Sequence, residues 1–368
     1  MRTDSNKTRA SGITYAYTPC SADWQHPVDR RRFPRYCQLT GIPLATADWK
    51  HRPDVLIVTQ AADLTYCSRI GREDCLIVFD ANDGYLIPRK RNFFDRGRGL
   101  FKFIVRQHKY PEAHYERTYL RMCERADAVV CSHPLQAAFL RHYCKNVHLI
   151  TDFPPNIELK RKRDYSIKGP INVFWEGLGT TRNMPFSEIN RIFGSRRDAS
   201  AFRFHLLTDL ELMRVSNHFF GTTVMDECRR KAPDLFKQFY FYQWNELVLS
   251  EVATKCDFGI IPIPLDNTAR MFKPENKLVL MWRMGIPTIV SATPSYAEAM
   301  TKVGCNLACF SDAEWQSNID RLLENEELRR TAGEDGYRHV ELNYSENAMR
   351  TKWDKVLASI GALPHATL

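Results

Sequence analysis

The sequence predicts an α/β protein with two domains of similar size, each built on an open parallel β-sheet covered by helices. Short runs that are apolar throughout recur along the chain, separated by segments with helical periodicity. This is the pattern of parallel strands that are buried on both faces. The pattern stops at a segment rich in proline and basic residues, 151–170, and then begins again. A chain of 368 residues also exceeds the length of one ordinary domain.

The first half contains five apolar runs that we expect to be strands: Ile13–Tyr17, Val55–Val58, Leu76–Phe79, Ala128–Cys131 and Val147–Ile150. The second half contains six further strand candidates: Ile171–Trp175, Phe202–Leu207, Phe239–Phe241, Phe258–Ile263, Thr288–Ser291 and Leu307–Phe310. Between the runs, apolar residues recur every three or four positions, as Tyr115, Tyr119 and Met122 do. That spacing is typical of helices that cover a sheet.

These patterns predict four parts of the chain. An N-terminal domain covers 1–150, a linker 151–170, a C-terminal domain 171–344 and a final helix 345–368. The linker carries Pro154 and Pro155, which interrupt regular structure. The final helix begins after Ser345, a residue type that caps helices. Its apolar side is formed by Met349, Trp353, Val356 and Ile360.

Composition narrows the class of protein. Hydrophobic residues make up 44% and charged residues 26%, as in globular proteins, and no uninterrupted apolar stretch reaches the about 18 residues of a membrane span. The polar, basic N-terminus is unlike a secretory signal. Eleven cysteines without a Cys-x-x-Cys pair indicate buried, reduced thiols and a cytoplasmic location. A net charge of +9 suits nucleic acid, an anionic membrane surface or phosphate-bearing substrates.

Ligands of open α/β sheets bind beyond the carboxyl ends of the strands, so residues that directly follow strands are the first candidates. Asp80 follows an apolar run and is either a catalytic or sugar-binding carboxylate or the start of an Asp-Gly turn. Glu176 follows another run and leads into a loop with Gly177, Gly179 and Arg182. Glycines permit close backbone approach to a ligand, and an arginine can bind a diphosphate bidentately, although such a loop is often only a turn.

A third loop, 264–277, carries Arg270, Lys273 and Lys277 and runs directly into the apolar stretch 278–284. Cations at a helix N-terminus form a natural diphosphate site. The alternative is a solvated loop whose lysines contact nothing.

This block also resembles a known family. Cys256–Pro264, then Pro274–Leu278, then Met284–Ser291 are similar to the donor site of GT-B glycosyltransferases of the family-four type. The resemblance extends in order over roughly residues 120–360. It implies two Rossmann-like domains that face a cleft, with the C-terminal helix crossing back to the N-terminal domain. It also implies that the C-terminal domain binds a nucleotide-sugar donor and the N-terminal domain an acceptor.

The resemblance assigns roles to residues of this chain. It places Asp80 beside the transferred sugar and Arg182 and Lys277 on the donor phosphates. The base would lie near Tyr242 and Trp244. Together with the loop residues, the expected donor-binding set is Gly177, Gly179, Thr180, Arg182, Tyr242, Trp244, Glu275, Asn276 and Lys277.

One departure from the family concerns its paired glutamates, which hold the donor sugar and ribose. The corresponding positions here are Phe272 and Leu280, and Glu275 is out of register with either. The identity of the donor and the retaining outcome therefore stay open at this point.

A basic segment in the first half holds eight cations between Pro88 and Lys109, interleaved with phenylalanines. Cations with aromatics suit an anionic membrane or a phosphate-rich acceptor, as well as single-stranded nucleic acid. A solvated loop is the plain alternative. We expect acceptor or membrane binding by Arg89, Arg91, Arg96, Arg98 and Lys102.

The sequence thus predicts a cytoplasmic, metal-independent and retaining glycosyltransferase. Peripheral binding at the inner face of the membrane is the other expected location. Asp80 and Glu176 are the expected catalytic carboxylates. No Asp-x-Asp motif predicts a metal site, no cofactor is expected beyond the nucleotide sugar as substrate, and no nucleic acid partner is expected. The expected acceptor is a glycan or lipid-linked glycan of polysaccharide or glycoconjugate synthesis. The alternatives are a non-catalytic nucleotide-sugar-binding subunit, another sugar-nucleotide enzyme and a basic nucleic-acid-binding protein.

Overall fold

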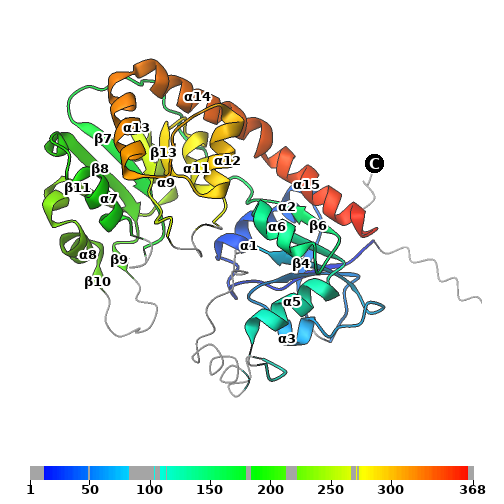
Figure 1. The fold of residues 1–368 in the computed structure, drawn as a ribbon. Coiled ribbons are helices and arrows are strands. Elements are labelled where there is room, and N and C mark those ends of the chain that lie inside the picture. The colour runs from blue at the N-terminus through cyan, green and yellow to red at the C-terminus, as the bar shows by residue number, and fades with distance from the viewer. Residues whose placement is uncertain are drawn as a thin grey trace, which may run out of the picture. The chain divides into compact units, whose positions relative to one another are not determined.

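The computed structural model describes residues 12–48, 50–82, 103, 108–112, 114–179, 184–212, 222–266, 271 and 273–363. The chain forms two compact units (Figure 1). The N-terminal unit contains the chain up to Phe153 together with the segment from Glu346 onward, and the C-terminal unit runs from Pro154 to Ser345. Each unit contains one six-stranded parallel sheet with flanking helices, which confirms the predicted α/β class.

The sheet of the N-terminal unit has the strand order β2-β1-β3-β4-β5-β6. Its strands are β1 (Tyr15–Tyr17), β2 (Leu44–Thr46), β3 (Val55–Thr59), β4 (Leu76–Ala81), β5 (Ala128–Cys131) and β6 (Val147–Leu149). Its helices are α1 (Pro27–Arg31), α2 (Phe33–Thr40), α3 (Leu64–Cys67), α5 (Tyr115–Arg125), α6 (Pro134–Leu140) and α15 (Glu346–Ser359). Strand β2 has no counterpart among the predicted strands, because it is short, partly exposed and carries no apolar run.

Two helical layers cover this sheet. One face packs its alternate strand residues, including Leu56 and Phe79, against α3, α5 and α6. On the other side of the unit, the ring of Trp353 in α15 lies 5.1 Å from that of Phe33 in α2, measured between centroids. The Tyr36 hydroxyl also donates a 2.7 Å hydrogen bond to Asp354. The last helix therefore packs on the N-terminal unit, as the family resemblance implies.

The sheet of the C-terminal unit has the order β11-β8-β7-β12-β13-β14. Its strands are β7 (Ile171–Glu176), β8 (Phe202–Thr208), β11 (Phe239–Gln243), β12 (Phe258–Ile261), β13 (Thr288–Ser291) and β14 (Ala308–Cys309). A separate two-stranded sheet pairs β9 (Glu211–Leu212) with β10 (Thr222–Thr223). The helices are α7 (Phe186–Phe193), α8 (Val224–Lys231), α9 (Glu246–Ala253), α11 (Asn276–Arg283), α12 (Pro294–Val303), α13 (Asp312–Glu324) and α14 (Glu326–Asn343), with the 3-10 helices η1 (Ala199–Ala201) and η2 (Pro233–Gln238).

Two glycines inside α14 explain how this helix packs on α11. A Cβ atom at Gly336 would lie 2.3 Å from Cδ1 of Trp282, and one at Gly333 would lie 2.4 Å from the carbonyl oxygen of Gly285. Any side chain at either position would push the helices apart, and this requirement outweighs the poor helix propensity of glycine. The buried Trp282 is thereby held at the centre of the helical layer.

The segment between the two sheets lies on the C-terminal unit. The amide of Lys162 donates to the carbonyl of Met284 at 2.8 Å, and Arg329 donates to the carbonyl of Tyr165 at 2.7 Å. Residues 154–170 of the expected linker thus contribute to the packing of this unit. The prolines and charged residues of this segment predict a linker. Its packing could not be predicted, because its partners Met284 and Arg329 are distant in the chain.

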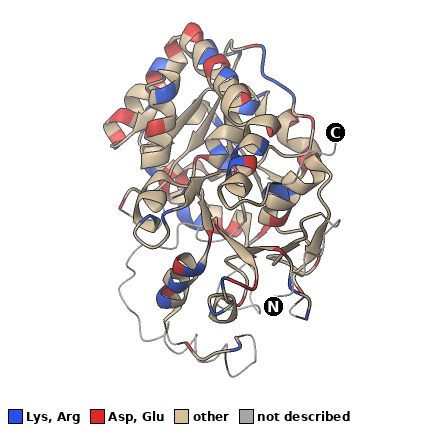
Figure 2. Cartoon of the chain, turned by 90° about the vertical axis from the view of Figure 1, so that its right-hand side faces the viewer, with Lys and Arg blue, Asp and Glu red and all other residues tan. Residues whose placement is uncertain are grey.

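Charged side chains of both signs are interspersed over the helices (Figure 2). Many form short-range ion pairs, such as Lys302 with Glu298 and Arg330 with Glu327. Nine of the eleven cysteines are buried, and burial raises the pKa of thiols such as Cys37, to about 12. Among the residues that the structure describes, no helix combines the length and the apolar character needed to cross a membrane.

Candidate functional site

The strand order of the C-terminal unit creates a switch point between β7 and β12. These neighbouring strands are parallel, and the chain leaves β7 toward β8 on one side and β12 toward β13 on the other. The connections that follow the two strands therefore diverge at the carboxyl edge of the sheet. In open α/β sheets, ligands bind in the crevice at such a point.

Lys277 spans this switch point. It lies in the first turn of α11, which follows β12, and its Nζ donates a 2.8 Å hydrogen bond to the carbonyl oxygen of Glu176 at the end of β7. Nζ also lies 4.6 Å from the centroid of the Trp175 ring. Burial lowers the pKa of the Lys277 ammonium below its ordinary value, although the charge of Glu176 opposes the shift. A new negative ligand at this position would relieve that cost.

The two glycines of the β7 loop are required by protein contacts. A Cβ atom at Gly177 would lie 2.4 Å from Nζ of Lys277 and 2.7 Å from the Trp175 ring. One at Gly179 would lie 2.5 Å from Cβ of Asp209, whose carboxylate accepts a hydrogen bond from the Gly179 amide at 3.0 Å. Gly177 therefore makes room for the lysine, and Gly179 makes room for the β8 loop. Direct approach of these glycines to a ligand stays a prediction.

The start of α12 is a second feature of this edge, and its residues are not among those predicted from the sequence. Thr293 and Ser295 are buried, and their hydroxyl oxygens have no hydrogen-bond partner among the described residues. Thr293 is the N-cap position of α12, yet its side chain makes no capping bond. The first-turn amides of a helix and buried hydroxyls are donors suited to phosphate or sugar oxygens. The available signal was the pair Thr293-Pro294 shortly after the expected strand 288–291, since proline is common in the first turn of a helix.

Glu176 and Glu275 have different surroundings. Glu176 is buried at the carboxyl end of β7, where it lies beside Lys277 at the switch point. Glu275 directly precedes α11, but its Oε1 accepts a 2.8 Å hydrogen bond from the Tyr344 hydroxyl at the end of α14. Burial raises the pKa of Glu275. The structure therefore gives Glu275 a role in packing α14, which does not support its expected role in donor binding.

The expected base-contacting residues lie on and after the edge strand β11. The amide of Trp244 donates to the carbonyl of Thr208 at 2.9 Å, which places Trp244 at the carboxyl edge beside the end of β8. The Tyr242 hydroxyl lies 2.9 Å from Nδ1 of His205, and the two rings are stacked. The Tyr242 hydroxyl is thus engaged within the sheet, and contact of Trp244 with a base stays a prediction.

Asp80 in the N-terminal unit forms a buried ion pair. Asp80 is fully buried near the end of β4. Its carboxylate accepts hydrogen bonds from Nε and Nη2 of Arg32 at distances between 2.6 and 3.0 Å. Arg32 also donates to the Ile150 carbonyl at 3.1 Å and to Asp152 at 3.3 Å. Burial favours loss of the Arg32 proton, but Asp80 and Asp152 more than offset it and raise the guanidinium pKa. This arrangement does not support the expected catalytic role of Asp80, because the carboxylate is already paired.

One group of side chains in the N-terminal unit has the composition of a metal site. Ligand atoms of Cys20, His26 and Asp29 lie within 4.8 Å of one another. The Asp29 carboxylate, however, accepts hydrogen bonds from Tyr17 and from the amides of Cys20 and Ser21. Nδ1 of His26 accepts from the Val28 amide, which leaves Nε2 protonated in the neutral ring. The residues present therefore fit a capped loop better than a metal centre.

Several expected site residues lie outside the described part of the chain. They are Thr180 and Arg182 in the donor set and Arg89, Arg91, Arg96, Arg98 and Lys102 in the acceptor or membrane set. Of the remaining donor set, the structure brings Gly177, Asn276 and Lys277 to the switch point, where Asn276 and Lys277 are the first two residues of α11.

Two Rossmann-like units, with the last helix returning to the first unit and a cationic switch point in the second, define the GT-B glycosyltransferase fold. Solved structures with this fold match the chain over most of its length. TarM matches with a TM-score of 0.56 at 8% sequence identity, over 82% of this chain and 54% of TarM. Sucrose-phosphate synthase from Thermosynechococcus elongatus matches with a TM-score of 0.55 at 13% identity, over 84% of this chain and 74% of its own.

WaaG, a glycosyltransferase involved in lipopolysaccharide biosynthesis, matches with a TM-score of 0.54 at 14% identity, over 85% of this chain and 79% of WaaG. A further structure of TarM, from S. aureus, holds fondaparinux, α-GlcNAc-glycerol and UDP. The chain spans about half the length of TarM. No family model and no curated protein matches the sequence. The likeness at these identities is one of fold.

Proposed function

We propose that this protein is a glycosyltransferase that moves a sugar from a nucleotide-sugar donor to a glycan or lipid-linked glycan acceptor. The observation that carries the proposal is the position of Lys277, whose half-buried side chain spans the β7–β12 switch point and contacts Glu176. A cation there can bind the donor diphosphate together with the N-terminus of α11. Among the fold neighbours, WaaG is involved in lipopolysaccharide biosynthesis and TarM was solved with UDP, which supports a donor of this class.

The proposed reaction requires stabilisation of a leaving phosphate. The bond between the sugar C1 and the phosphate oxygen breaks, and its electron pair stays on that oxygen. Lys277 and the first-turn amides of α11 and α12 are positioned to stabilise the added charge. Positive charge from the protein would serve where other enzymes use a metal ion, and the reaction would need no cofactor beyond the donor.

The proton of the acceptor hydroxyl needs a destination. Since Asp80 is paired with Arg32, we propose a retaining reaction in which the leaving phosphate oxygen accepts this proton. Glu176 is the remaining carboxylate of the expected catalytic pair, and it lies at the carboxyl end of β7 in the C-terminal unit. Its proposed role is to position Lys277 and the transferred sugar.

A second candidate is a nucleotide-sugar-binding subunit without catalysis. It is favoured by one observation: Leu280 and Phe272 stand where the resembling family has glutamates that hold the donor. The two candidates separate in one experiment. A thermal-shift screen of nucleotide sugars identifies the donor, because a ligand of the native state raises the melting temperature. The identified donor is then incubated with glycan acceptors. Transfer supports the enzyme, and donor binding without any turnover supports the binding subunit.

Product analysis with the donor alone provides the matching control. An epimerase or another sugar-nucleotide enzyme would convert the donor without an acceptor, whereas a glycosyltransferase would release nucleotide slowly by hydrolysis and faster when an acceptor is added. Free nucleotide and modified sugar are separated by chromatography.

A further inference from the structure

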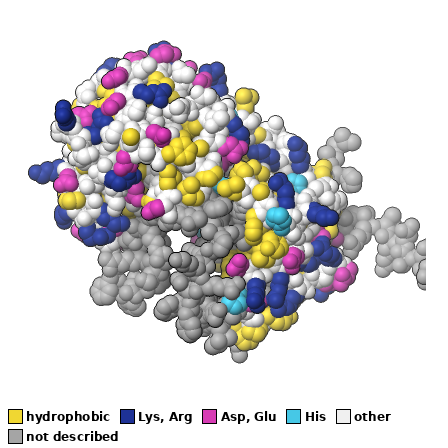
Figure 3. Space-filling model, in the orientation of Figure 1, with side chains coloured by type: hydrophobic (Ala, Val, Ile, Leu, Met, Phe, Trp, Pro, Cys, Tyr) yellow, Lys and Arg dark blue, Asp and Glu magenta, His cyan; other side chains and the backbone are white. Residues whose placement is uncertain are grey.

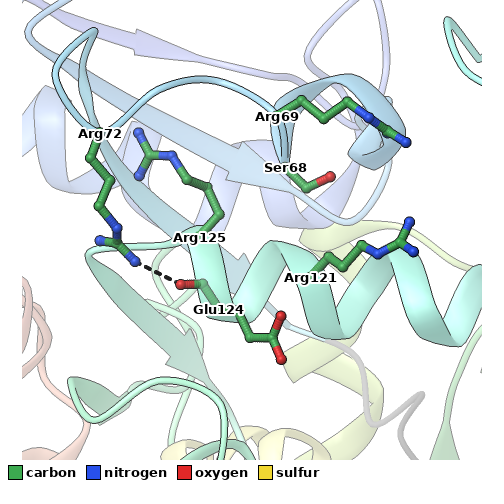
Figure 4. Close-up of a pocket in the computed structure, with 6 residues that line it drawn as sticks. All are labelled: Ser68, Arg69, Arg72, Arg121, Glu124 and Arg125. Atoms are coloured by element: carbon green, nitrogen blue, oxygen red, sulfur yellow. Dashed lines mark hydrogen bonds between the residues drawn. The ribbon is translucent and has the colours of Figure 1, made fainter.

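A pocket rich in arginine lies at the amino end of the sheet in the N-terminal unit. It has a volume of about 470 Å³ and is lined by Ser68, Arg69, Arg72, Arg121, Glu124 and Arg125 (Figure 4). Residues 68–72 precede the start of β4, and the end of α5 precedes the start of β5. The pocket therefore lies at the opposite end of the strands from Asp80 and is separate from the sites described above.

Arg125 forms one side of this pocket, and hydrogen bonds fix its position. Its side chain is buried, and it donates to the carbonyl oxygens of Gly71 at 2.7 Å and Cys75 at 2.8 Å. Nη1 also lies 3.1 Å from the Asp127 carboxylate. These bonds fix the turn before β4 against α5. The other guanidinium groups are thus presented from a fixed backbone rather than from a loose loop.

Arg72 is held at the rim by two contacts. Nη1 pairs with Asp127 at 2.8 Å, and Nη2 donates to the carbonyl oxygen of Glu124 at 2.7 Å, the bond drawn in Figure 4. The side chain is half exposed, with 57% of its surface accessible, so it is both positioned and reachable. A positioned guanidinium loses less entropy when it binds a ligand.

Arg69 and Arg121 form the open side. Arg69 stacks on the Tyr110 ring at 4.3 Å, and Nη1 of Arg121 pairs with Glu112 at 2.9 Å. Figure 4 shows both guanidinium groups on the side of the pocket where the Ser68 hydroxyl lies, with the Glu124 carboxylate turned away from Arg69 and Arg125. Arg69 also donates to the Thr65 carbonyl, but each guanidinium carries five N–H donors, so these contacts leave donors for a ligand.

The surface around the pocket has the same character. Lys and Arg side chains gather on the face of the N-terminal unit that carries α3 and α5 (Figure 3). Lys109, whose Nζ lies over the Tyr66 ring at 4.1 Å, adds to the cations next to Arg69 and its partner Tyr110. A concave site with several guanidinium donors and one inward-facing hydroxyl suits a compact oxyanion with several acceptor oxygens.

We propose that this pocket binds a phosphate group, carried either by a soluble phosphate ester or by a lipid headgroup. The fork geometry of arginine matches phosphate oxygens bidentately. The proposal does not depend on glycosyl transfer. The pocket lies at the amino ends of the strands, whereas the candidate site residues follow the carboxyl ends.

The test is a calorimetric titration with inorganic phosphate at low ionic strength, where exposed charges are least screened. A Lys277→Ala background removes the contribution of the switch point in the C-terminal unit. We expect Arg69→Glu with Arg121→Glu to weaken phosphate binding by about tenfold or more, the size of a lost charge-assisted contact. The matched control is Lys237→Glu with Lys255→Glu, two exposed lysines of the C-terminal unit that change the net charge equally. This control should bind phosphate as the parent does.

A conservative pair keeps the test informative if charge reversal disturbs folding. Arg69→Lys with Arg121→Lys preserves charge but loses the guanidinium fork, and we expect an intermediate loss of affinity. Flotation with vesicles that contain phosphatidic acid then distinguishes the source. Loss of flotation in the reversed variant alone identifies a lipid headgroup, and unchanged flotation with weaker phosphate binding identifies a soluble ester. Equal phosphate affinity in parent and reversed variant, or equal loss in the control, overturns the proposal.

Discussion

The ammonium group of Lys277 donates a 2.8 Å hydrogen bond to the carbonyl oxygen of Glu176, 101 residues earlier in the chain. This bond joins the N-terminus of α11 to the end of β7, across the switch point of the C-terminal sheet. The Trp175 ring contacts this ammonium group, and Gly177 leaves room for it because a Cβ atom there would collide with the lysine. The proposed donor site depends on this arrangement.

The first prediction concerns pH. Burial lowers the pKa of Lys277, so its proton is lost at a lower pH than from an exposed lysine. The charged form binds phosphate, so donor affinity should fall as pH rises through this lowered pKa, beginning below the usual value of about 10.4. Calorimetry with the donor at increasing pH measures the decline. Lys277→Arg should keep its affinity over the same range, because arginine stays protonated. A decline of equal size in Lys277→Arg would contradict the assignment.

The second prediction concerns Gly177. In Gly177→Ala, the new methyl group would lie 2.4 Å from Nζ of Lys277 and 2.7 Å from the Trp175 ring, so the lysine must move. We expect donor affinity to fall by about 1 to 2 kcal/mol, the scale of a displaced charged hydrogen bond. Gly304→Ala is the control, since it has open space around its Cβ position and lies at the far end of α12. Unchanged donor affinity in Gly177→Ala would show that the lysine position is not needed.

The third prediction concerns the buried hydroxyl of Thr293, which has no partner among the described residues. Thr293→Val keeps the shape and removes an unsatisfied polar group, so the free energy of unfolding should rise by about 1 kcal/mol. Donor affinity should fall, because the hydroxyl is available for the ligand. The control is Thr288→Val, where the hydroxyl donates to the Ile286 carbonyl at 2.8 Å and its loss should lower stability. Urea denaturation and calorimetry distinguish the two. Lower stability in both variants would argue that Thr293 is bonded in solution.

The fourth prediction concerns Asp80. Asp80→Asn leaves the buried Arg32 charge with Asp152 as its remaining carboxylate partner, so the free energy of unfolding should fall by about 3 kcal/mol or more. Turnover per folded molecule should change only a few-fold. Asp312→Asn, which removes an exposed partner of Arg191, should cost less than about 1 kcal/mol. A fully stable Asp80→Asn protein that has lost turnover about a hundredfold would restore Asp80 as a catalytic group.

Much of the fold could be predicted from the sequence. Runs such as Val55–Val58 and Ala128–Cys131 are apolar throughout because the strands are buried on both faces, and that signal is local. Strand β2 has no such signal, since it pairs at the edge with β1 and is largely exposed. The place of Lys277 at the start of a helix could be predicted, because a polar loop runs there into the apolar stretch 278–284.

The roles of other site residues depended on distant partners. Arg32 is 48 residues from Asp80, and Tyr344 is 69 residues from Glu275. No spacing rule reveals either pairing, so both carboxylates looked available for ligands. The reason for Gly179 is likewise a contact with Asp209 in the next loop. Local sequence indicates where a loop lies, whereas the partner of each polar side chain is decided by the packing of the whole unit.

The most direct test of the account is calorimetric binding of the nucleotide sugar found by thermal-shift screening to the parent protein and to Lys277→Ala. The account predicts a weaker complex, by roughly 1.5–3 kcal/mol, because a charged hydrogen-bond donor to the diphosphate is lost. Lys255→Ala, an exposed lysine at the opposite end of the same sheet, serves as the control and should bind as the parent does. The same affinity in the parent and in Lys277→Ala would contradict the proposed donor site.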